Sequence, residues 1–187
     1  MCKNRKGDVT AKTTQDKGVD LKRLVMPVVL DACCGSRMFW FNKTDKRSLF
    51  VDKREGVCIN DIGTRGTKGR SPSVISPDKI VDFRDMPFCD NWFWHVVFDP
   101  PHLHQKVGYT GVIAFKYGIL DSSWEKDLRL GFSECFRVLK KGGTLIFKWS
   151  ESEIPLQKVL SLSDYKPLYG HKSGKKAQTH WVAFVKA

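Results

Sequence analysis

The stretch Val28-Val29-Leu30-Asp31-Ala32-Cys33-Cys34-Gly35-Ser36-Arg37 determines how the rest of the sequence is interpreted. Its short apolar run ends in an acid and continues into small residues and one glycine, which predicts a buried strand that turns into a helix. Small side chains at such a turn let a ligand approach the backbone N–H groups at the helix N-terminus. The stretch has neither the Gly-Lys-Ser/Thr of a phosphate loop nor the Gly-x-Gly-x-x-Gly of dinucleotide-binding proteins. We therefore expect a ligand-binding turn of a different kind.

Three further apolar runs end in an aspartate in the same way. Residues 49–52, 79–82 and 94–99 predict strands that end in Asp52, Asp82 and Asp99. Because function in parallel sheets gathers at the carboxyl ends of the strands, the four acids are expected on one rim. Taken singly, an acid at a strand end can also cap a helix or face water, so the expectation rests on the set of four.

The second half of the chain alternates helical and strand patterns. From Ser122 or Ser123 to Lys140, apolar residues recur at spacings of three and four, which predicts an amphipathic helix. A strand over 144–149, a short helix over 155–162, and strands over 165–169 and 181–185 joined by a 170–179 loop are expected to follow. This alternation indicates a single α/β domain with a mostly parallel sheet and helices on both faces.

Length and charge set the limits on function. The chain has 187 residues and a net charge of +12, and the excess lies in residues 1–25, 53–70 and 165–187. We expect a basic tail over 1–25 and one domain over 26–187, and disorder is one alternative for the tail. The excess positive charge favours a polyanionic partner, although any one such run is also an ordinary solvated surface.

The cysteines and the apolar runs exclude several classes of protein. The six cysteines form no Cys-x-x-Cys pair, which argues against a zinc ribbon or a disulfide scaffold. His102-Leu103-His104 has no acid or cysteine cluster around it, so no metal site is expected. All apolar runs are too short for a membrane span, and the N-terminus lacks a signal-peptide core. These features predict a cytoplasmic protein.

The order of these motifs resembles that of class I methyltransferases that use S-adenosylmethionine, and the resemblance covers about residues 26–187. Arg37 stands where the first motif of that family, Asp-x-x-x-Gly-x-Gly, has its last glycine. The resemblance implies a Rossmann-like fold with seven strands and an antiparallel C-terminal strand. It also implies the cofactor-binding residues. Asp31, Ala32 and the turn Cys33-Cys34-Gly35 would serve the methionine moiety, Asp52 with Lys53 the ribose, and Asp82 with Phe83 the adenine.

The tetrapeptide Asp99-Pro100-Pro101-His102 follows the fourth predicted strand directly. Two prolines hold a rigid, extended turn, and a carboxylate beside a free carbonyl can accept both hydrogens of an amine. A rigid turn without chemistry is the other interpretation. The tetrapeptide resembles the Asp/Asn-Pro-Pro-aromatic motif of amino-methyltransferases that modify adenine N6, cytosine N4 or a glutamine amide, with His102 at the aromatic position. Short enzymes of this kind also resemble ones encoded by phages and mobile elements.

A nucleic-acid base is the acceptor that these features favour. Lys172, Lys175 and Lys176 lie among small residues as phosphate contacts would, and Tyr109 belongs to a segment over 104–117 that suits either a lid with stacking groups or a connector. A hairpin tip that only aids solubility is the alternative for the lysines. We expect methylation of adenine N6 in RNA or DNA, with RNA slightly favoured. The alternatives are a protein or small-molecule amine methyltransferase, and a nucleic-acid-binding module that has the fold without turnover.

Overall fold

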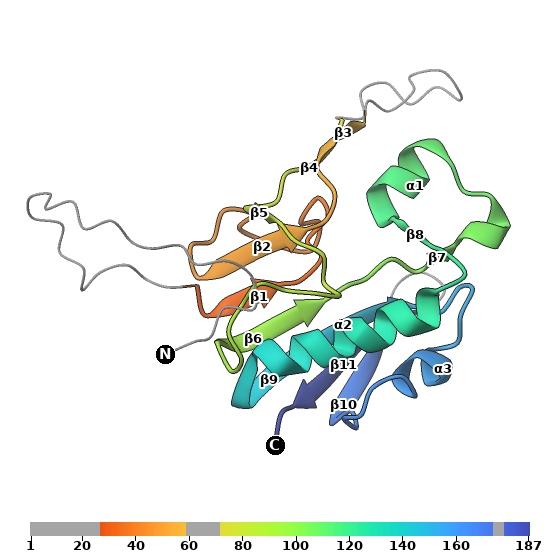
Figure 1. Cartoon of the computed structure of the whole chain (residues 1–187). Coiled ribbons are helices and arrows are strands. Elements are labelled where there is room, and N and C mark those ends of the chain that lie inside the picture. The colour runs from red at the N-terminus through yellow and green to blue at the C-terminus, as the bar shows by residue number, and fades with distance from the viewer. Residues whose placement is uncertain (1–26, 59–71, 174–177) are drawn as a thin grey trace, which may run out of the picture.

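A seven-stranded sheet organises the chain (Figure 1). The computed structural model describes residues 27–58, 72–173 and 178–187. The strand order is β5-β2-β1-β6-β9-β11-β10. The bounds in that order are β5 Lys79–Ile80, β2 Ser48–Asp52, β1 Val29–Asp31, β6 Phe93–Phe98, β9 Leu139–Ser150, β11 Thr179–Val185 and β10 Tyr169–Ser173.

Strand direction confirms the predicted α/β class. Strands β5, β2, β1, β6 and β9 pair in parallel, with Leu30 opposite Leu49 on one side and Val96 on the other. The C-terminal strand β11 runs antiparallel to both of its neighbours, as predicted. Because β1 pairs in parallel on both sides, it is central, and its carboxyl end lies in the middle of the predicted rim.

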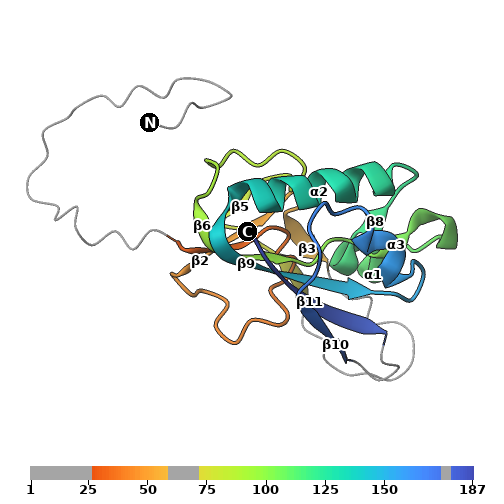
Figure 2. The ribbon, with the colours of Figure 1, turned by 90° about the horizontal axis from the view of Figure 1, so that it is seen from below.

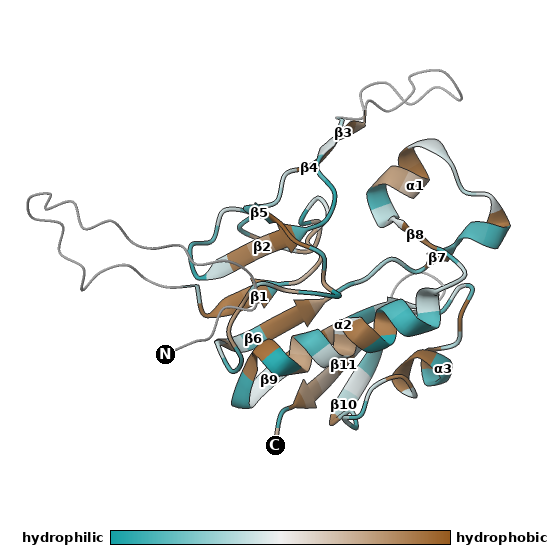
Figure 3. Cartoon of the chain, viewed as in Figure 1, coloured by the Kyte–Doolittle hydropathy of each residue, from teal (hydrophilic) through white to brown (hydrophobic). Residues whose placement is uncertain are grey.

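One face of the sheet is covered by helix α2, Trp124–Val138 (Figure 2). Leu128, Phe132, Cys135 and Phe136 are buried along one side of the helix, which confirms the predicted amphipathic pattern and trims its ends. Figure 3 shows the same mixture of apolar and polar residues on α2, against the mainly apolar β2 and β6.

Helix α3, Leu156–Leu160, lies beside α2 on the same face. Lys158 forms an ion pair of 2.7 Å with Glu125, and Tyr165, just beyond α3, stacks on Phe136 with ring centroids 3.8 Å apart. Val159 of α3 is fully buried in the same core. The two helices therefore form a single layer.

The opposite face differs from the predicted helical layer. Residues 32–47 form a series of turns and contain no helix, although a helix was predicted to follow β1. Trp40 packs edge-on against Phe50 of β2 at 4.8 Å, and Phe39 against Trp181 of β11 at 5.3 Å. Val182, next to Trp181 on β11, belongs to the core under α2, so Trp181 points to the other side. Aromatic side chains of the 32–47 segment therefore cover this face. Figure 2 shows this segment on the side of the sheet opposite α2.

Two predicted boundaries are wrong at the C-terminal half. β9 begins at Leu139 rather than Thr144, because Leu139 already pairs with Phe93 before a register shift. β10 begins at Tyr169, where the 165–169 strand was expected to end, because Tyr169–Ser173 pairs with β11. The basic tail predicted over 1–25 lies outside the described residues.

Two small sheets stand at the carboxyl end of the main sheet. β3 (Gly56–Cys58) pairs antiparallel with β4 (Ser73–Ile75), and β7 (Leu103–His104) pairs in parallel with β8 (Ile119–Leu120). Between β7 and β8 the chain forms the 3-10 helix Gln105–Val107 and helix α1, Gly111–Tyr117. Figure 1 shows α1 beyond the carboxyl ends of β1 and β6. None of the described helices has the length and apolar content needed to cross a bilayer.

Candidate active site

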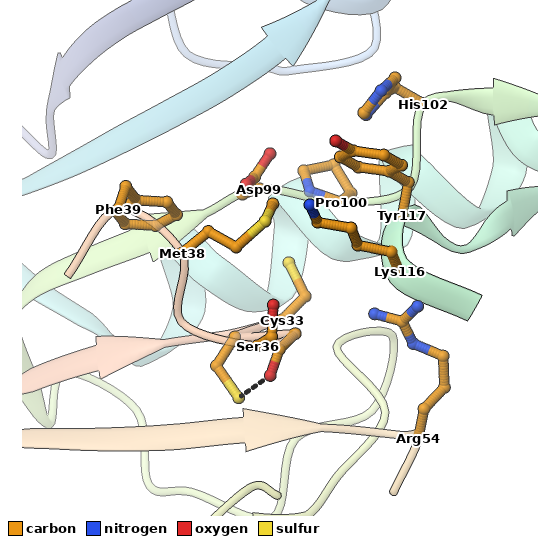
Figure 4. Close-up of a pocket in the computed structure, with 12 residues that line it drawn as sticks. Cys33, Ser36, Met38, Phe39, Arg54, Asp99, Pro100, His102, Lys116 and Tyr117 are labelled. Atoms are coloured by element: carbon orange, nitrogen blue, oxygen red, sulfur yellow. Dashed lines mark hydrogen bonds between the residues drawn. The ribbon is translucent and has the colours of Figure 1, made fainter. Parts of the chain in front are cut away.

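A pocket opens at the carboxyl edge of β1 and β6 (Figure 4). It is built by the turn after β1, by the tetrapeptide after β6, by Arg54 after β2 and by the end of α1. The lining residues are Cys33, Cys34, Gly35, Ser36, Met38, Phe39, Arg54, Asp99, Pro100, His102, Lys116 and Tyr117. The structure thus brings six of the predicted residues together: Cys33, Cys34, Gly35, Asp99, Pro100 and His102.

The turn after β1 is held by backbone bonds to both neighbouring strands. The Ala32 N–H donates to the Val97 carbonyl and the Cys34 N–H to the Val51 carbonyl, each at 2.9 Å. Gly35 has a φ of +49°, a conformation that glycine adopts without steric cost. A Cβ at Gly35 would find no atom closer than 3.9 Å, so the backbone there is open to a ligand.

Arg37 also has a positive φ, +53°. This is the position at which the methyltransferase motif has glycine, so the backbone keeps the glycine-like conformation while the side chain differs. The guanidinium donates to the Ser76 carbonyl at 2.8 Å, to Asp78 at 2.9 Å and to the Lys43 carbonyl. Arg37 therefore anchors the loop that follows the turn.

Asp31 is buried under the turn and does not line the pocket. Its carboxylate accepts from the Trp40 Nε1–H at 2.7 Å and from the Cys33 N–H at 3.4 Å. Burial raises its pKa to about 7, and the nearby Asp99 and Asp52 contribute to the rise, while the Trp40 hydrogen bond opposes it. Ala32 is buried as well. These two residues shape the turn from beneath.

Asp52 is buried and its two carboxylate oxygens are already occupied. Oδ2 accepts from the Gly35 N–H at 2.9 Å and Oδ1 from the Arg54 N–H at 2.9 Å. The Arg54 guanidinium adds a fork, with Nε on Oδ1 and an Nη on Oδ2, each at 3.0 Å. Lys53 points away, exposed to solvent. A ribose at Asp52 would have to share the carboxylate with Arg54.

Asp82 and Phe83 lie apart from the pocket. Arg84 forms a fork on Asp82, with 2.6 Å to Oδ2, and also reaches Asp127 of α2 at 3.1 Å. The Arg84 hydrogen bonds lower the pKa of Asp82 despite its partial burial. The Phe83 ring is buried in the core against Phe98, with centroids 5.3 Å apart. Asp82 lies on the predicted rim, but its carboxylate binds Arg84, which connects this loop to α2.

Asp99 lies in the pocket as half of an ion pair. Lys148 Nζ of β9 lies 2.7 Å from Asp99 Oδ2, and both side chains are largely buried. Lys148 also lies over the rings of Phe39 and Trp181 at 5.4 and 5.7 Å. Among the described residues, Lys148 is the hydrogen-bond donor to Asp99, which leaves Oδ1 available to a ligand.

His102 forms the wall beside Asp99. Its ring lies 5.4 Å from the Tyr117 ring and 6.3 Å from that of Trp149. Burial lowers the pKa of His102, so the ring is neutral at pH 7. Pro101 does not line the pocket; it packs against Gly118, where a Cβ would come within 2.8 Å of its Cγ.

The predicted substrate contacts lie away from this pocket. Hydrogen bonding to Glu153, in the loop after β9, raises the pKa of Tyr109, and Tyr109 is not among the lining residues. Lys172 is 62% exposed and lies 3.6 Å from Glu151 in a second groove that also contains His180. Lys175 and Lys176 lie outside the described residues. No described group of three or more His, Cys, Asp or Glu could hold a metal.

Besides the six predicted residues, the fold brings six more to the pocket: Ser36, Met38, Phe39, Arg54, Lys116 and Tyr117. Lys116 and Tyr117 belong to the 104–117 segment that was predicted as a lid or a connector. Lys148 stands just behind the lining. Arg54 had a signal, because Asp45-Lys46-Arg47, Asp52-Lys53-Arg54 and Asp82-Phe83-Arg84 repeat an Asp-x-Arg pattern. In each copy the arginine donates its backbone N–H and its guanidinium to the aspartate two residues before. The repeat shows that these acids have local partners.

Comparison with known proteins gives structural likenesses alone. No family model matches the chain, and no curated protein matches it. The PH0226 protein of Pyrococcus horikoshii OT3 superposes with a TM-score of 0.49 at 16% identity, over 85% of this chain and 81% of that one. The 1,6-didemethyltoxoflavin-N1-methyltransferase of Burkholderia thailandensis, solved with 1,6-didemethyltoxoflavin and S-adenosylhomocysteine, gives 0.49 at 12% identity over 86% and 71%. A SAM-dependent methyltransferase of Methanosarcina mazei gives 0.45 at 13% identity over 84% and 91%.

Proposed function

We propose that this chain is an S-adenosylmethionine-dependent methyltransferase that transfers a methyl group to an exocyclic amine of a nucleic-acid base. Adenine N6 is the proposed acceptor, in RNA in preference to DNA. One observation carries the proposal: the open turn Cys33-Cys34-Gly35 after β1 and the Asp99-Pro100 pair after β6 line the same pocket. A cofactor-type turn and an amine-accepting pair in one pocket are what methyl transfer to an amine requires.

The residues around the turn fit the methionyl part of the cofactor. Gly35 leaves its backbone uncovered, and small side chains on either side give a ligand access. The ribose would lie at Asp52, directly below the Gly35 N–H, and would share that carboxylate with Arg54. When bound, S-adenosylmethionine supplies a methyl group on a sulfonium, from which the sulfur leaves as a neutral thioether.

Asp99 and Pro100 would prepare the acceptor amine. An exocyclic NH₂ is a weak nucleophile because its lone pair is delocalised into the ring. Asp99 Oδ1 and the Pro100 carbonyl can accept its two hydrogens, which localises the lone pair on nitrogen. With the cofactor bound, the nitrogen would form the new N–C bond as the S–C bond broke, and its surplus proton would leave to solvent. Neutral His102 offers a flat ring to the base without adding positive charge beside a sulfonium.

The nucleic-acid acceptor is supported by charge. The chain carries +12, and Lys172 presents an exposed ammonium on β10, one residue before the end of that strand. Phosphate contacts from lysines supply affinity without reading sequence, and unpaired bases of a folded RNA can enter a pocket without being flipped from a duplex. An unpaired RNA base therefore enters the pocket at a lower free-energy cost than a base of duplex DNA.

The primary experiment is methyl transfer from labelled S-adenosylmethionine to RNA, genomic DNA, cell protein and small amines in parallel, followed by mass analysis of the products. The proposal expects label on N6-methyladenosine in RNA, and loss of at least about 100-fold in Asp99→Ala with cofactor binding retained. Asp164→Asn, an exposed acid outside the pocket, is the matched control. Label on a glutamine amide or a small amine would show that the acceptor is not a nucleic-acid base. Binding of nucleic acid without transfer to any acceptor would indicate a module that has lost turnover.

A second experiment tests the nucleic-acid contact. Changing Lys172, Lys175 and Lys176 together to Gln should weaken RNA binding and reduce the slope of log K against log salt by about 2. Changing Lys126 and Arg129 on α2 and Lys141 at the start of β9 to Gln gives the same loss of charge at another place on the surface. Equal slopes in the two triple variants would remove the C-terminal hairpin from the proposed interface.

A further inference from the structure

Three cations surround the pocket, and they differ in their partners. The Arg54 guanidinium is held by Asp52, and Lys148 by Asp99. Lys116 of α1 forms no ion pair with any residue in the described ranges; its ammonium lies 5.3 Å from the Tyr117 ring. Lys116 is also half-buried, so its charge is less screened than that of an exposed lysine. Among the described residues around the pocket, Lys116 is therefore the cation that can meet a ligand anion.

Lys116 is held in a fixed place above the cofactor-type turn. Its carbonyl oxygen lies 3.9 Å from where a Cβ of Gly35 would stand. The preceding carbonyl, that of Phe115, accepts from the Arg54 guanidinium at 2.9 Å, and Arg54 is itself fixed on Asp52. Gly118 then packs against Pro101. The end of α1 is thus tied to β2 and to the tetrapeptide on either side of Lys116.

The Lys116 side chain points from α1 into the pocket, towards Pro100 and the side on which Met38 lies (Figure 4). The turn Cys33-Cys34-Gly35 lines the same pocket below it. A ligand that contacts the Gly35 backbone would therefore have an ammonium above it and the carboxylate of Asp99 beside it.

We infer that Lys116 binds the carboxylate of the methionyl part of the cofactor. This inference rests on the proposed function, because it requires S-adenosylmethionine or S-adenosylhomocysteine in the pocket. The methionyl part carries a carboxylate, so its site needs a cation. Lys116 lies above the turn proposed for that part and has no ion-pair partner among the described residues. An ammonium in a half-buried site forms a charge-assisted bond to a carboxylate.

Calorimetric titration of the whole chain tests this inference with two ligands, S-adenosylhomocysteine and 5′-methylthioadenosine, which lacks the carboxylate. Lys116→Met should weaken S-adenosylhomocysteine binding by about 10- to 100-fold and change 5′-methylthioadenosine binding by less than about 2-fold. Lys116→Arg should retain most of the affinity. Lys106→Met, on the neighbouring 3-10 helix, is the control and should bind both ligands as the parent chain does. Far-ultraviolet circular dichroism checks that each variant is folded.

The outcomes separate the inference from the proposed function. If the parent chain binds neither ligand, the proposed function fails and the inference fails with it. If the parent chain binds S-adenosylhomocysteine and Lys116→Met binds it equally well, the inference alone is overturned. Equal losses for both ligands would also overturn it, because they would show that Lys116 supports α1 and makes no contact with the carboxylate.

Discussion

The ammonium of Lys148 lies 2.7 Å from Oδ2 of Asp99, across neighbouring strands of the sheet. Asp99 follows the carboxyl end of β6, and Lys148 lies beside it on β9. The ion pair fixes Oδ2 of Asp99 and leaves Oδ1 for the hydrogens of the substrate amine. Lys148 is therefore a positioning residue that acts through Asp99.

Lys148→Met should lower the rate of methyl transfer by about 10- to 100-fold while the affinity for S-adenosylhomocysteine changes by less than about 2-fold. Without the ammonium, the Asp99 carboxylate loses its fixed orientation. Single-turnover transfer and calorimetry measure the two quantities, and Lys148→Arg should restore part of the rate. Lys148→Met combined with Asp99→Asn should be no slower than Asp99→Asn alone. A double variant that multiplies the two losses would contradict action through Asp99.

Arg37 has a positive φ, and its guanidinium makes four contacts. Three are the hydrogen bonds described above, and the fourth is the Phe50 ring, whose centroid lies 3.9 Å away. Arg37→Ala keeps the unfavourable φ and loses the contacts, whereas Arg37→Gly loses the same contacts and relieves the φ. Both should reduce the free energy of unfolding, with Gly more stable than Ala by about 1 kcal/mol. Urea denaturation measures the difference. Equal stability of the two variants would show that φ at this position carries no cost.

Strands β1, β2, β5 and β6 were predictable because each belongs to a short apolar run that leads to an aspartate, and parallel pairing brings such ends to one edge. The helix predicted after β1 was wrong for a physical reason. Arg37 adopts a left-handed conformation, and Phe39 and Trp40 then pack on Trp181 and Phe50, which lie on strands far apart in the sheet. These tertiary contacts override the local pattern, and one sequence window does not reveal them.

The sequence predicts which residues after the strands reach the pocket, but it predicts less well which side chains they bind. Gly35, Asp99 and His102 follow directly from their positions after strands, and they line the pocket. The aspartates Asp31 and Asp52 are buried instead, because each satisfies a donor next to it. Lys148 had a signal of its own, since a lysine within a largely buried strand requires an acidic partner. Lys116 belongs to the 104–117 segment predicted as a lid or a connector, but its place above the turn depends on how α1 folds back, which the sequence does not show.

Asp31 predicts a pH dependence of stability. Its folded pKa of about 7 is above the ordinary value of 3.8, so folding favours the protonated form. The contribution to stability is full below about pH 4, and it is lost as pH rises towards 7 and through it. Asp31→Asn, which can still accept from Trp40, should remove this loss. Its stability relative to the parent chain should therefore rise by a few kcal/mol between pH 4 and 8, since a tenfold change in the acid dissociation constant corresponds to about 1.4 kcal/mol.

Urea denaturation of both proteins at several pH values measures this difference. A constant difference across that range would show that Asp31 does not titrate with a raised pKa. Asp164→Asn serves as the control, because its carboxyl is exposed and its substitution should leave the pH dependence of the parent chain unchanged.

Gly118 tests whether the end of α1 is held in place by packing. It has a φ of +71°, and a Cβ there would lie 2.8 Å from Pro101 Cγ and 3.2 Å from an Arg54 guanidinium nitrogen. Gly108 has a φ of +74° and a ψ of 29°, the left-handed conformation, with no atom within 4 Å, whereas Gly118 has a ψ of 166°, a region that only glycine adopts readily. Gly108→Ala therefore meets no clash and carries a smaller backbone cost than Gly118→Ala. Gly118→Ala should be less stable than Gly108→Ala by about 1–3 kcal/mol and should bind S-adenosylhomocysteine more weakly. Thermal unfolding and calorimetry compare the two. Equal stability would mean that α1 yields to the added methyl group, and its tie to Arg54 and Pro101 would not hold Lys116 in place.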